Sequence, residues 1–555
     1  MPKPVPEKRW PGCGATWSIG AIITIGFMLR VWTLPESLWI DELHTAWTVS
    51  GSWEEVATRA RLGNNHPLFY HFVYGLVQVA GVREWTLRLL SLACGTGLIP
   101  LAYACTRRWG FARSTSLLAA ALIAVDPHCL YFSREARPYA ALQLVALASF
   151  AMLLQRLRTP RCRWRIGWIG LATLAFYLHY TAALFVAGQV VAAFALRLAP
   201  PEKTAPPARP ARAIDFALDL LVIAVACSWP TMTHIWQVAA RRDNWQSFVP
   251  RSPLFELFTI YPLVWYWTLP LVLLASSHLW ARGRGKAAAL SPVPTRESGS
   301  PAAEGSLPNR VTRPEDRFME RLAAALLTWF FATLVMAWAL TASDVARLFF
   351  RRYVIGVGVV PALFAAWAWQ QATAPSRLPA PLRRGLAVIM GGIVILGIGP
   401  FANPFYGWPI ARHNHEDWRA AVAWINDAPG PRREWPVWIR SGLIEADAWS
   451  ESPDPVRRDY CLLPVISIYT LNRGHPLVPL ANQDQPRVSE ATRTAARQRG
   501  GVWLLLRGRP AVLDVVVESL RTELATARQR STVLEDHSWG NVRALAVQLD
   551  DVGGP

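Results

Sequence analysis

The chain has 555 residues, of which 52% are hydrophobic and 17% charged, with a formal net charge of +19. Apolar runs near the ~20 residues that cross a bilayer recur from about residue 15 to residue 400, which excludes a string of soluble domains. The basic residues lie mainly between these runs and form no RNA-binding motif, so no nucleic-acid partner is expected.

The apolar runs predict a mostly α, polytopic helical membrane protein with about eleven spans. The first run follows a basic start and lacks a small-residue cleavage site, so we interpret it as a retained transmembrane helix. Many of the 28 tryptophans flank these runs, as in interfacial belts. The predicted spans are residues 17–34, 85–106, 114–131, 138–155, 166–180, 181–198, 214–233, 257–280, 320–341, 353–371 and 385–402.

The loops between the spans alternate in charge. One set is basic, including Arg107 and Arg108 and the run 156–165, and the positive-inside rule places this set in the cytoplasm with the N-terminus. The Pro-, Gly- and Ser-rich linker 281–319 belongs to the same side and is expected to be disordered. An odd number of spans places the C-terminus outside. We therefore expect a multi-pass protein of the cell inner membrane with a periplasmic or extracellular C-terminal domain.

The first outer loop, about 35–84, contains a short apolar segment, His66–Ala80. Counting it as a span would break the alternation of loop charge, so an interfacial helix on the outer surface is expected, with a short true span as the alternative.

An acidic pair, Asp41 and Glu42, lies in the sequence SLWIDELHTAW just after the first span. Such a pair acts as a general base or binds a cation, and its structural alternative is a solvated helix N-terminus. A divalent cation at this pair is the one cofactor suggested, and none is certain.

The second outer loop reads DPHCLYFSREARPYA and brings Arg134, Glu135, Arg137 and Tyr139 together at the mouth of a span. Guanidinium groups suit a phosphate, whereas an Arg–Glu structural pair is the alternative. Further candidates for substrate or phosphate contact are His66, Asp126, His179, Tyr180, Arg351, Arg352 and Tyr353.

Six pieces in order resemble the GT-C membrane glycosyltransferases, in particular the branch of dolichyl-phosphate-mannose–protein mannosyltransferases and the aminoarabinose transferase of lipid A. They are WIDELHTA, NHPLFYHFVYGL, EWTLRLLSLACGTGLIPLAYACTRRWG, DPHCLYFSREARPYA, YLHYTAALFVAGQ and FFRRYVIGVGVVP. EDWRAAVAWI, after the last span, is a familiar opening for an outer domain in such proteins.

The resemblance implies a polyprenyl-phosphate sugar donor and chemistry at the outer membrane surface. It implies that Asp41 is the catalytic acid position, with Glu42 beside it, and that Glu135 is the acid of the second outer loop. Arg352 and Tyr353 match an Arg-Tyr pair where a phosphate contact is expected. The chain departs from the pattern at Asp126, where Ser is usual, so whether Asp126 or Glu135 is the second acid stays open.

We therefore expect a glycosyltransferase that moves a sugar from a polyprenyl phosphate to an acceptor hydroxyl, with inversion. The expected partners are the donor, membrane lipids and an acceptor glycan, lipid or protein; a transporter or flippase of lipid-linked glycans is the alternative. Residues 1–403 would form the membrane module and residues 404–555 a small outer α/β domain. In that domain, 511–530 reads as a helix, and WPVWIR, GVWLLLRG, STVLEDHSWG and VRALAVQL read as strands.

Overall fold

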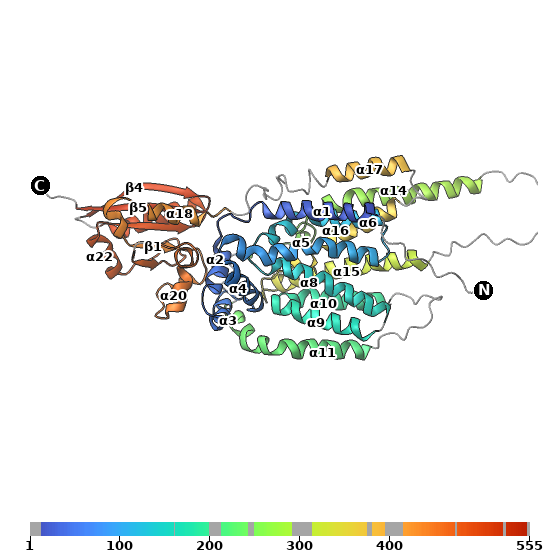
Figure 1. The fold of residues 1–555 in the computed structure, drawn as a ribbon, viewed down its shortest axis with the longest axis horizontal. Helices are drawn as coiled ribbons and strands as arrows, with labels where there is room; N and C mark the ends of the chain where they lie inside the picture. The colour runs from blue at the N-terminus through green and yellow to red at the C-terminus, as the bar shows by residue number, and fades with distance from the viewer. Residues whose placement is uncertain are drawn as a thin grey trace, which may run out of the picture.

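A helical bundle and a smaller domain with a sheet lie end to end along the molecule (Figure 1). This is a computed structural model of the chain. Between the two parts lie three short helices of the first loop. The structure describes residues 13–159, 161–198, 213–241, 249–290, 314–373, 380–393, 415–471, 474–525 and 529–551.

The bundle consists of apolar helices whose ends carry the polar residues. α5, for example, begins at Glu84 and ends at Arg107 and Arg108, charges that complement its dipole. The bundle helices are α1 (Cys13–Val31), α5 (Glu84–Arg108), α6 (Arg113–Val125), α7 (Pro127–Ser133), α8 (Tyr139–Arg158), α9 (Cys162–Leu178), α10 (Ala182–Leu198), α11 (Ala213–Pro230), α14 (Leu263–Leu290), α15 (Pro314–Ala342), α16 (Val360–Ala372) and α17 (Ala380–Ile393). Short turns are η1 (Thr231–Ile235), α12 (Trp236–Ala240), η2 (Leu254–Phe258) and η3 (Ile355–Val357).

The mostly helical membrane fold predicted from the sequence is confirmed. Within the described ranges, four helices are long and apolar enough to cross a membrane, five if the bent pair α6 and α7 is one span, and shorter apolar helices accompany them. Each of the eleven predicted spans overlaps a helix of the structure, although the last predicted span extends beyond the described residues. The middle of the predicted linker 281–319 also lies outside them, whereas its two ends belong to α14 and α15.

Two predicted spans have different boundaries in the structure. Residues 114–131 bend by 55° between α6 and α7, because Asp126 accepts a hydrogen bond from the backbone of Cys129 and caps a new helix with Pro127 in its first turn. The predicted span 353–371 begins with a turn and η3, and its helix starts only at Val360. Both irregular segments border the site described below.

The first loop folds into α2 (Ile40–Val49), α3 (Trp53–Leu62) and α4 (Leu68–Ala80). α3 begins with a reciprocal capping box in which Ser52 and Glu55 bond to each other's backbone amides. The three helices gather at the end of the bundle that faces the smaller domain (Figure 1). Most of the predicted segment His66–Ala80 is thus helical, as α4, whereas its place on the membrane surface stays a prediction.

The smaller domain contains a five-stranded sheet of order β2-β1-β3-β5-β4. β1 runs parallel to β2 and β3, whereas β5 is antiparallel to both of its neighbours. The strands are β1 (Val437–Arg440), β2 (Leu477–Pro479), β3 (Gly501–Arg507), β4 (Gln529–Trp539) and β5 (Val542–Asp551). The helices are α18 (Trp418–Asn426), η5 (Gly430–Glu434), α19 (Ala446–Trp449), α20 (Pro455–Cys461), α21 (Leu463–Ile466), α22 (Glu490–Gln498) and α23 (Pro510–Leu524).

The strands predicted in this domain are confirmed, but the predicted helix 511–530 was too long. α23 ends at Leu524, and Gln529 and Arg530 already pair with Asp551 and Asp550 of β5. Ladder hydrogen bonds to β5 thus outweigh the helical preference of this segment.

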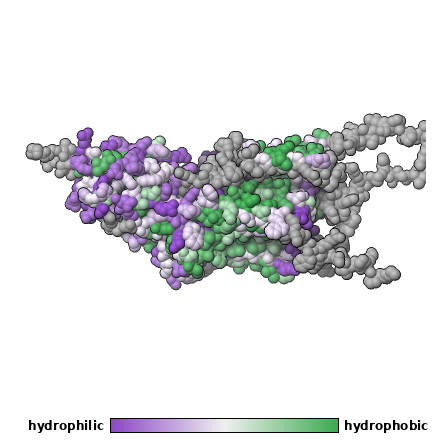
Figure 2. All heavy atoms as spheres, turned by 45° about the horizontal axis from the view of Figure 1, so that its top comes forward, coloured by the Kyte–Doolittle hydropathy of each residue, from purple (hydrophilic) through white to green (hydrophobic). Residues whose placement is uncertain are grey.

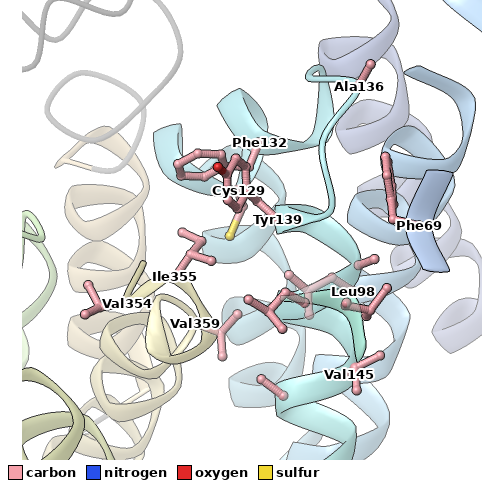
Figure 3. Packing of buried hydrophobic residues seen from close by; sticks show 14 of the residues in the cluster. Phe69, Leu98, Cys129, Phe132, Ala136, Tyr139, Val145, Val354, Ile355 and Val359 are labelled. Carbon is pink, nitrogen blue, oxygen red and sulfur yellow. The ribbon is translucent and has the colours of Figure 1, made fainter. Parts of the chain in front are cut away.

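The surface follows the same division. Apolar side chains cover the visible flank of the bundle, whereas polar ones dominate the smaller domain (Figure 2). Inside the bundle, Cys129 and Phe132 of α7, Tyr139 of α8 and Ile355 of η3 pack close together (Figure 3). This core holds the segments that carry the candidate site.

Candidate active site

An ion pair joins the first loop to a late loop of the bundle. The Nη1 of Arg352 lies 3.0 Å from Oδ2 of Asp41, in the first turn of α2. The Asp41 side chain is 23% exposed, so this carboxylate remains accessible. Burial acts to raise the pKa of Asp41, but the cations Arg137, Arg352 and Arg507 hold that pKa below its ordinary value. Asp41 is therefore a carboxylate at neutral pH.

Arg137, in the loop between α7 and α8, forms hydrogen bonds with the segments around Asp41. It donates to the backbone oxygen of Asp41 at 3.3 Å, to the Tyr70 hydroxyl at 2.9 Å and to Oδ1 of Asn65 at 3.2 Å. The guanidinium thus ties α2, α4 and the second outer loop together. Asn65 and Tyr70 belong to NHPLFY, and the sequence reasoning did not single them out.

A cavity of about 660 Å³ lies beside this ion pair. Arg352 is part of its wall, and Trp39 lies two residues before Asp41. The wall is mostly aromatic and apolar, with charge contributed by Glu135, Glu256 and two arginines. The lining residues are Trp39, Tyr131, Phe132, Glu135, Tyr139, Pro250, Ser252, Phe255, Glu256, Thr259, Ile260, Phe349, Phe350, Arg351 and Arg352.

Glu135 is the buried acid of the cavity. Its side chain is nearly inaccessible, and burial raises its pKa to about 8, with further increases from Glu42 and Asp41. The Tyr131 hydroxyl and Arg137 oppose this shift. Glu135 is therefore mostly a neutral carboxylic acid near pH 7, able to donate a hydrogen bond into the cavity.

Glu42 has a different environment from its neighbour. It forms a fully buried ion pair with Arg88, whose Nε and Nη2 lie 2.7 and 2.5 Å from the two carboxylate oxygens. Glu42 also accepts from the backbone amide of Ala136 at 2.8 Å. Arg88 in turn donates to the carbonyl groups of Leu34 and Glu36. Glu42 thus fastens the first loop to α5 and the second outer loop, which supports a positioning role.

Two further candidates of the second outer loop have structural partners. Asp126 caps α7 and accepts a hydrogen bond from the Tyr266 hydroxyl. It is buried and does not line the cavity, whereas Glu135 does. Arg134 is also buried and donates to the backbone oxygen of Leu29. Of the two acids left open by the sequence, Glu135 is therefore the one placed beside the ion pair.

The aromatic and histidine candidates form two groups, one of which includes a residue of the cavity wall. The His179 ring lies 5.7 Å from Tyr139 and 6.0 Å from Tyr353, between centroids. Tyr139 lines the cavity, and the Tyr353 ring packs against the guanidinium of Arg352. His66 and Tyr180 pack together in a separate cluster. The Tyr180 hydroxyl forms a hydrogen bond of 2.5 Å with Nδ1 of His234.

No group of three His, Cys, Asp or Glu side chains that could hold a metal ion is found in the described part of the chain. At the position suggested for a cation, the Asp41 carboxylate faces Arg352 and both Glu42 oxygens face Arg88. Guanidinium groups thus supply the positive charge there.

Some site residues could not be found from the sequence. Arg88 lies near the start of the predicted span 85–106, and Glu416 lies in the other domain, yet both contact the loop that carries the acids. The one signal in the sequence for Arg88 was its charge within an apolar run, because a charged residue in a span is usually paired or functional.

Part of the chain is similar to a known family. Residues 65–206 match the family model described as dolichyl-phosphate-mannose-protein mannosyltransferase. The match confirms the resemblance to GT-C glycosyltransferases over the part of the chain that it covers. No curated protein matches the chain.

Three solved structures are among those to which the chain is similar. ArnT from Cupriavidus metallidurans bound to undecaprenyl phosphate is 14% identical, with a TM-score of 0.47, and the alignment covers 97% of this chain and 98% of that one. The arabinofuranosyltransferase AftD from Mycobacteria is 12% identical, with a TM-score of 0.47 and coverage of 98% and 40%. The oligosaccharyltransferase AglB from Archaeoglobus fulgidus, in complex with an inhibitory peptide and a dolichol-phosphate, is 10% identical, with a TM-score of 0.45 and coverage of 89% and 69%.

Proposed function

We propose that this chain, a relative of the GT-C glycosyltransferases, transfers a sugar from a polyprenyl phosphate to an acceptor hydroxyl on the outer face of the membrane. The observation that carries the proposal is the ion pair Asp41–Arg352, whose arginine lines a cavity that Glu135 also lines. An ionised base, a cation for a phosphate and an apolar wall for a lipid are thereby combined in one place.

In the proposed step, the acceptor oxygen attacks the anomeric carbon of the sugar. The bond from that carbon to the phosphate oxygen breaks, and the polyprenyl phosphate leaves with the bonding electrons. The hydroxyl proton passes to the Asp41 carboxylate, a contribution of about 10²–10⁴-fold for general-base catalysis. One displacement inverts the anomeric configuration, and the phosphate ester supplies the activation without a nucleotide.

The cavity residues would stabilise the departing phosphate. Arg351 and Arg352 lie in its wall and offer planar donors to an oxyanion. Neutral Glu135 would donate a further hydrogen bond to the same group. The aromatic residues, among them Phe255 and Phe349, would contact the first isoprene units and the sugar face.

The experiment compares a deletion strain with strains that express the wild type or Asp41→Asn. Mass spectrometry of lipids and envelope glycans should show an accumulated polyprenyl-phosphate sugar in the deletion strain and the loss of one glycan. Wild type, but not Asp41→Asn, should restore that glycan. Restoration by Asp41→Asn would contradict the proposal. A lipid-linked sugar that moves across the membrane without being consumed would indicate the flippase instead.

A further inference from the structure

We propose that Glu416, in the smaller domain, is a positioning residue for Asp41, so that the domain is a working part of the active site. The inference rests on the proposed function, because it concerns the placement of the proposed base. Nothing in the sequence ties residue 416 to residue 41, and the relation is visible only in the folded chain.

The Glu416 carboxylate is buried at the junction of the two parts, with 5% of the side chain exposed. Its Oε2 accepts from the backbone amide of Ile40 at 3.1 Å and from the Trp418 indole at 2.9 Å. Its Oε1 accepts from Nε of Arg507 at 2.7 Å. Both oxygens are therefore engaged, one of them with the first residue of α2.

The contact with Ile40 matters because a helix begins with unpaired backbone amides and a partial positive charge. Trp39, at the N-cap position of α2, offers no side-chain hydrogen bond. Glu416 supplies an acceptor and a negative charge to this helix end from another domain. Asp41 is the next residue along the helix.

Other residues of the smaller domain hold the strand that leads into α2. The Tyr469 hydroxyl accepts from the amide of Leu38 at 2.9 Å, and Ser37 Oγ accepts from the amide of Arg419 at 3.3 Å. Arg419 also donates to the carbonyl of Pro35 at 3.1 Å. The segment 35–40 is thus held at four points by one domain.

Glu416 itself is fixed by the β4–β5 turn. The amide of Asn541 donates to the carbonyl of His415 at 2.7 Å, and Glu416 forms a β-bridge with Gly540. Gly540 has φ +68°, and a Cβ there would lie 1.9 Å from the His415 oxygen. Only glycine permits this close approach. The sheet therefore sets the position of the carboxylate that meets α2.

A catalytic group displaced by about 1 Å from its working position can cost on the order of 10²-fold in rate. Losing the bond at Ile40 would let the first turn of α2 shift or fray, and Asp41 lies in that turn. The expected defect is in turnover, since Arg351 and Arg352, which would bind the phosphate, lie in the loop before η3 and not in α2.

The test uses the full chain in detergent or in native membranes. Glu416→Gln is nearly isosteric, but it has a single acceptor oxygen, so it cannot accept from both Ile40 and Arg507, and it removes the negative charge from the start of α2. Glu84→Gln is the matched control, because Glu84 also binds the smaller domain, through Arg419 and Tyr469, without touching α2. Turnover is measured with the accumulated lipid-linked sugar, and affinity with undecaprenyl phosphate as the probe.

Glu416→Gln should lower kcat at least about tenfold while the Kd for undecaprenyl phosphate changes less than twofold, and Glu84→Gln should remain near wild type. Equal kcat values for the two variants would overturn the inference, as would a loss confined to lipid affinity. Asp41→Asn, measured in parallel, separates the two claims. If Asp41→Asn retains full turnover, the proposed function is wrong. If Asp41→Asn is inactive but Glu416→Gln is fully active, only the positioning role of Glu416 is wrong.

Discussion

Arg352 and Asp41 stand 311 residues apart in the chain, yet their side chains meet at 3.0 Å. The pair joins the first outer loop to the loop between α15 and η3, and its arginine lines the cavity. In the proposed reaction its two members separate in function, since the carboxylate receives a proton and the guanidinium receives a phosphate.

The first prediction concerns the separate roles of Arg352 in phosphate binding and Asp41 in proton transfer. Arg352→Ala should weaken binding of undecaprenyl phosphate by roughly 10- to 100-fold, as expected for the loss of a charge-assisted hydrogen bond worth about 1.5–3 kcal/mol. Asp41→Asn should leave that affinity within a few fold and abolish transfer. Binding measured by displacement of a labelled lipid phosphate checks both. Unchanged affinity in Arg352→Ala would remove this residue from the phosphate site.

The second prediction concerns pH. Although burial acts to raise it, the pKa of Asp41 is held below its ordinary value by nearby arginines, so the midpoint of the acid limb of kcat/KM should lie below the pH at which a free aspartate titrates. Glu135 has a pKa raised to about 8, so it loses its proton as the pH rises through 8 and then repels a phosphate. Activity should decline along this basic limb.

Glu135→Gln is the control for the basic limb, because the amide stays neutral and similar in shape at every pH. This variant should retain much of the activity at pH 7 and lose the decline near pH 8. An acid limb near pH 8 in the wild type would mean that Glu135, and not Asp41, is the base.

The adjacent acids Asp41 and Glu42 show what sequence reasoning could and could not reach. Their spacing after the first span predicted a site, and the resemblance favoured Asp41 for catalysis. The partner of Glu42 is Arg88, 46 residues away inside a helix, and this pairing follows from tertiary packing. The sequence could therefore not separate an accessible carboxylate from a buried structural one.

The fold shows the same limit. Hydropathy located the spans because each must satisfy its backbone within the bilayer. It missed the break between Asp126 and Pro127, although Asp-Pro is a helix start signal, since the apolar run continues across it. The role of Glu416 depends on how the two parts dock, and no local pattern in EDWRAAVAWI encodes that contact.

The third prediction concerns stability. Glu42→Gln leaves Arg88 buried without a full charge partner, and breaking a buried ion pair costs about 3–5 kcal/mol. The melting temperature in detergent should fall clearly. Asp41→Asn alters a partly exposed pair, so its melting temperature should stay close to that of the wild type. A stable, inactive Glu42→Gln would instead assign Glu42 a chemical role.

The fourth prediction concerns the orientation of the chain in the membrane. Cys162 is exposed at the start of α9, in a loop predicted to face the cytoplasm, whereas the other cysteines with described side chains are buried or only partly exposed. In a background with Cys13→Ser, a membrane-impermeant maleimide should leave Cys162 unlabelled in intact cells and label it after permeabilisation. Glu490→Cys, on the exposed surface of α22, should react with the impermeant reagent once the outer envelope is opened. The reverse pattern would place Asp41 on the cytoplasmic side, because α2, which carries Asp41, lies at the end of the bundle that faces the smaller domain (Figure 1).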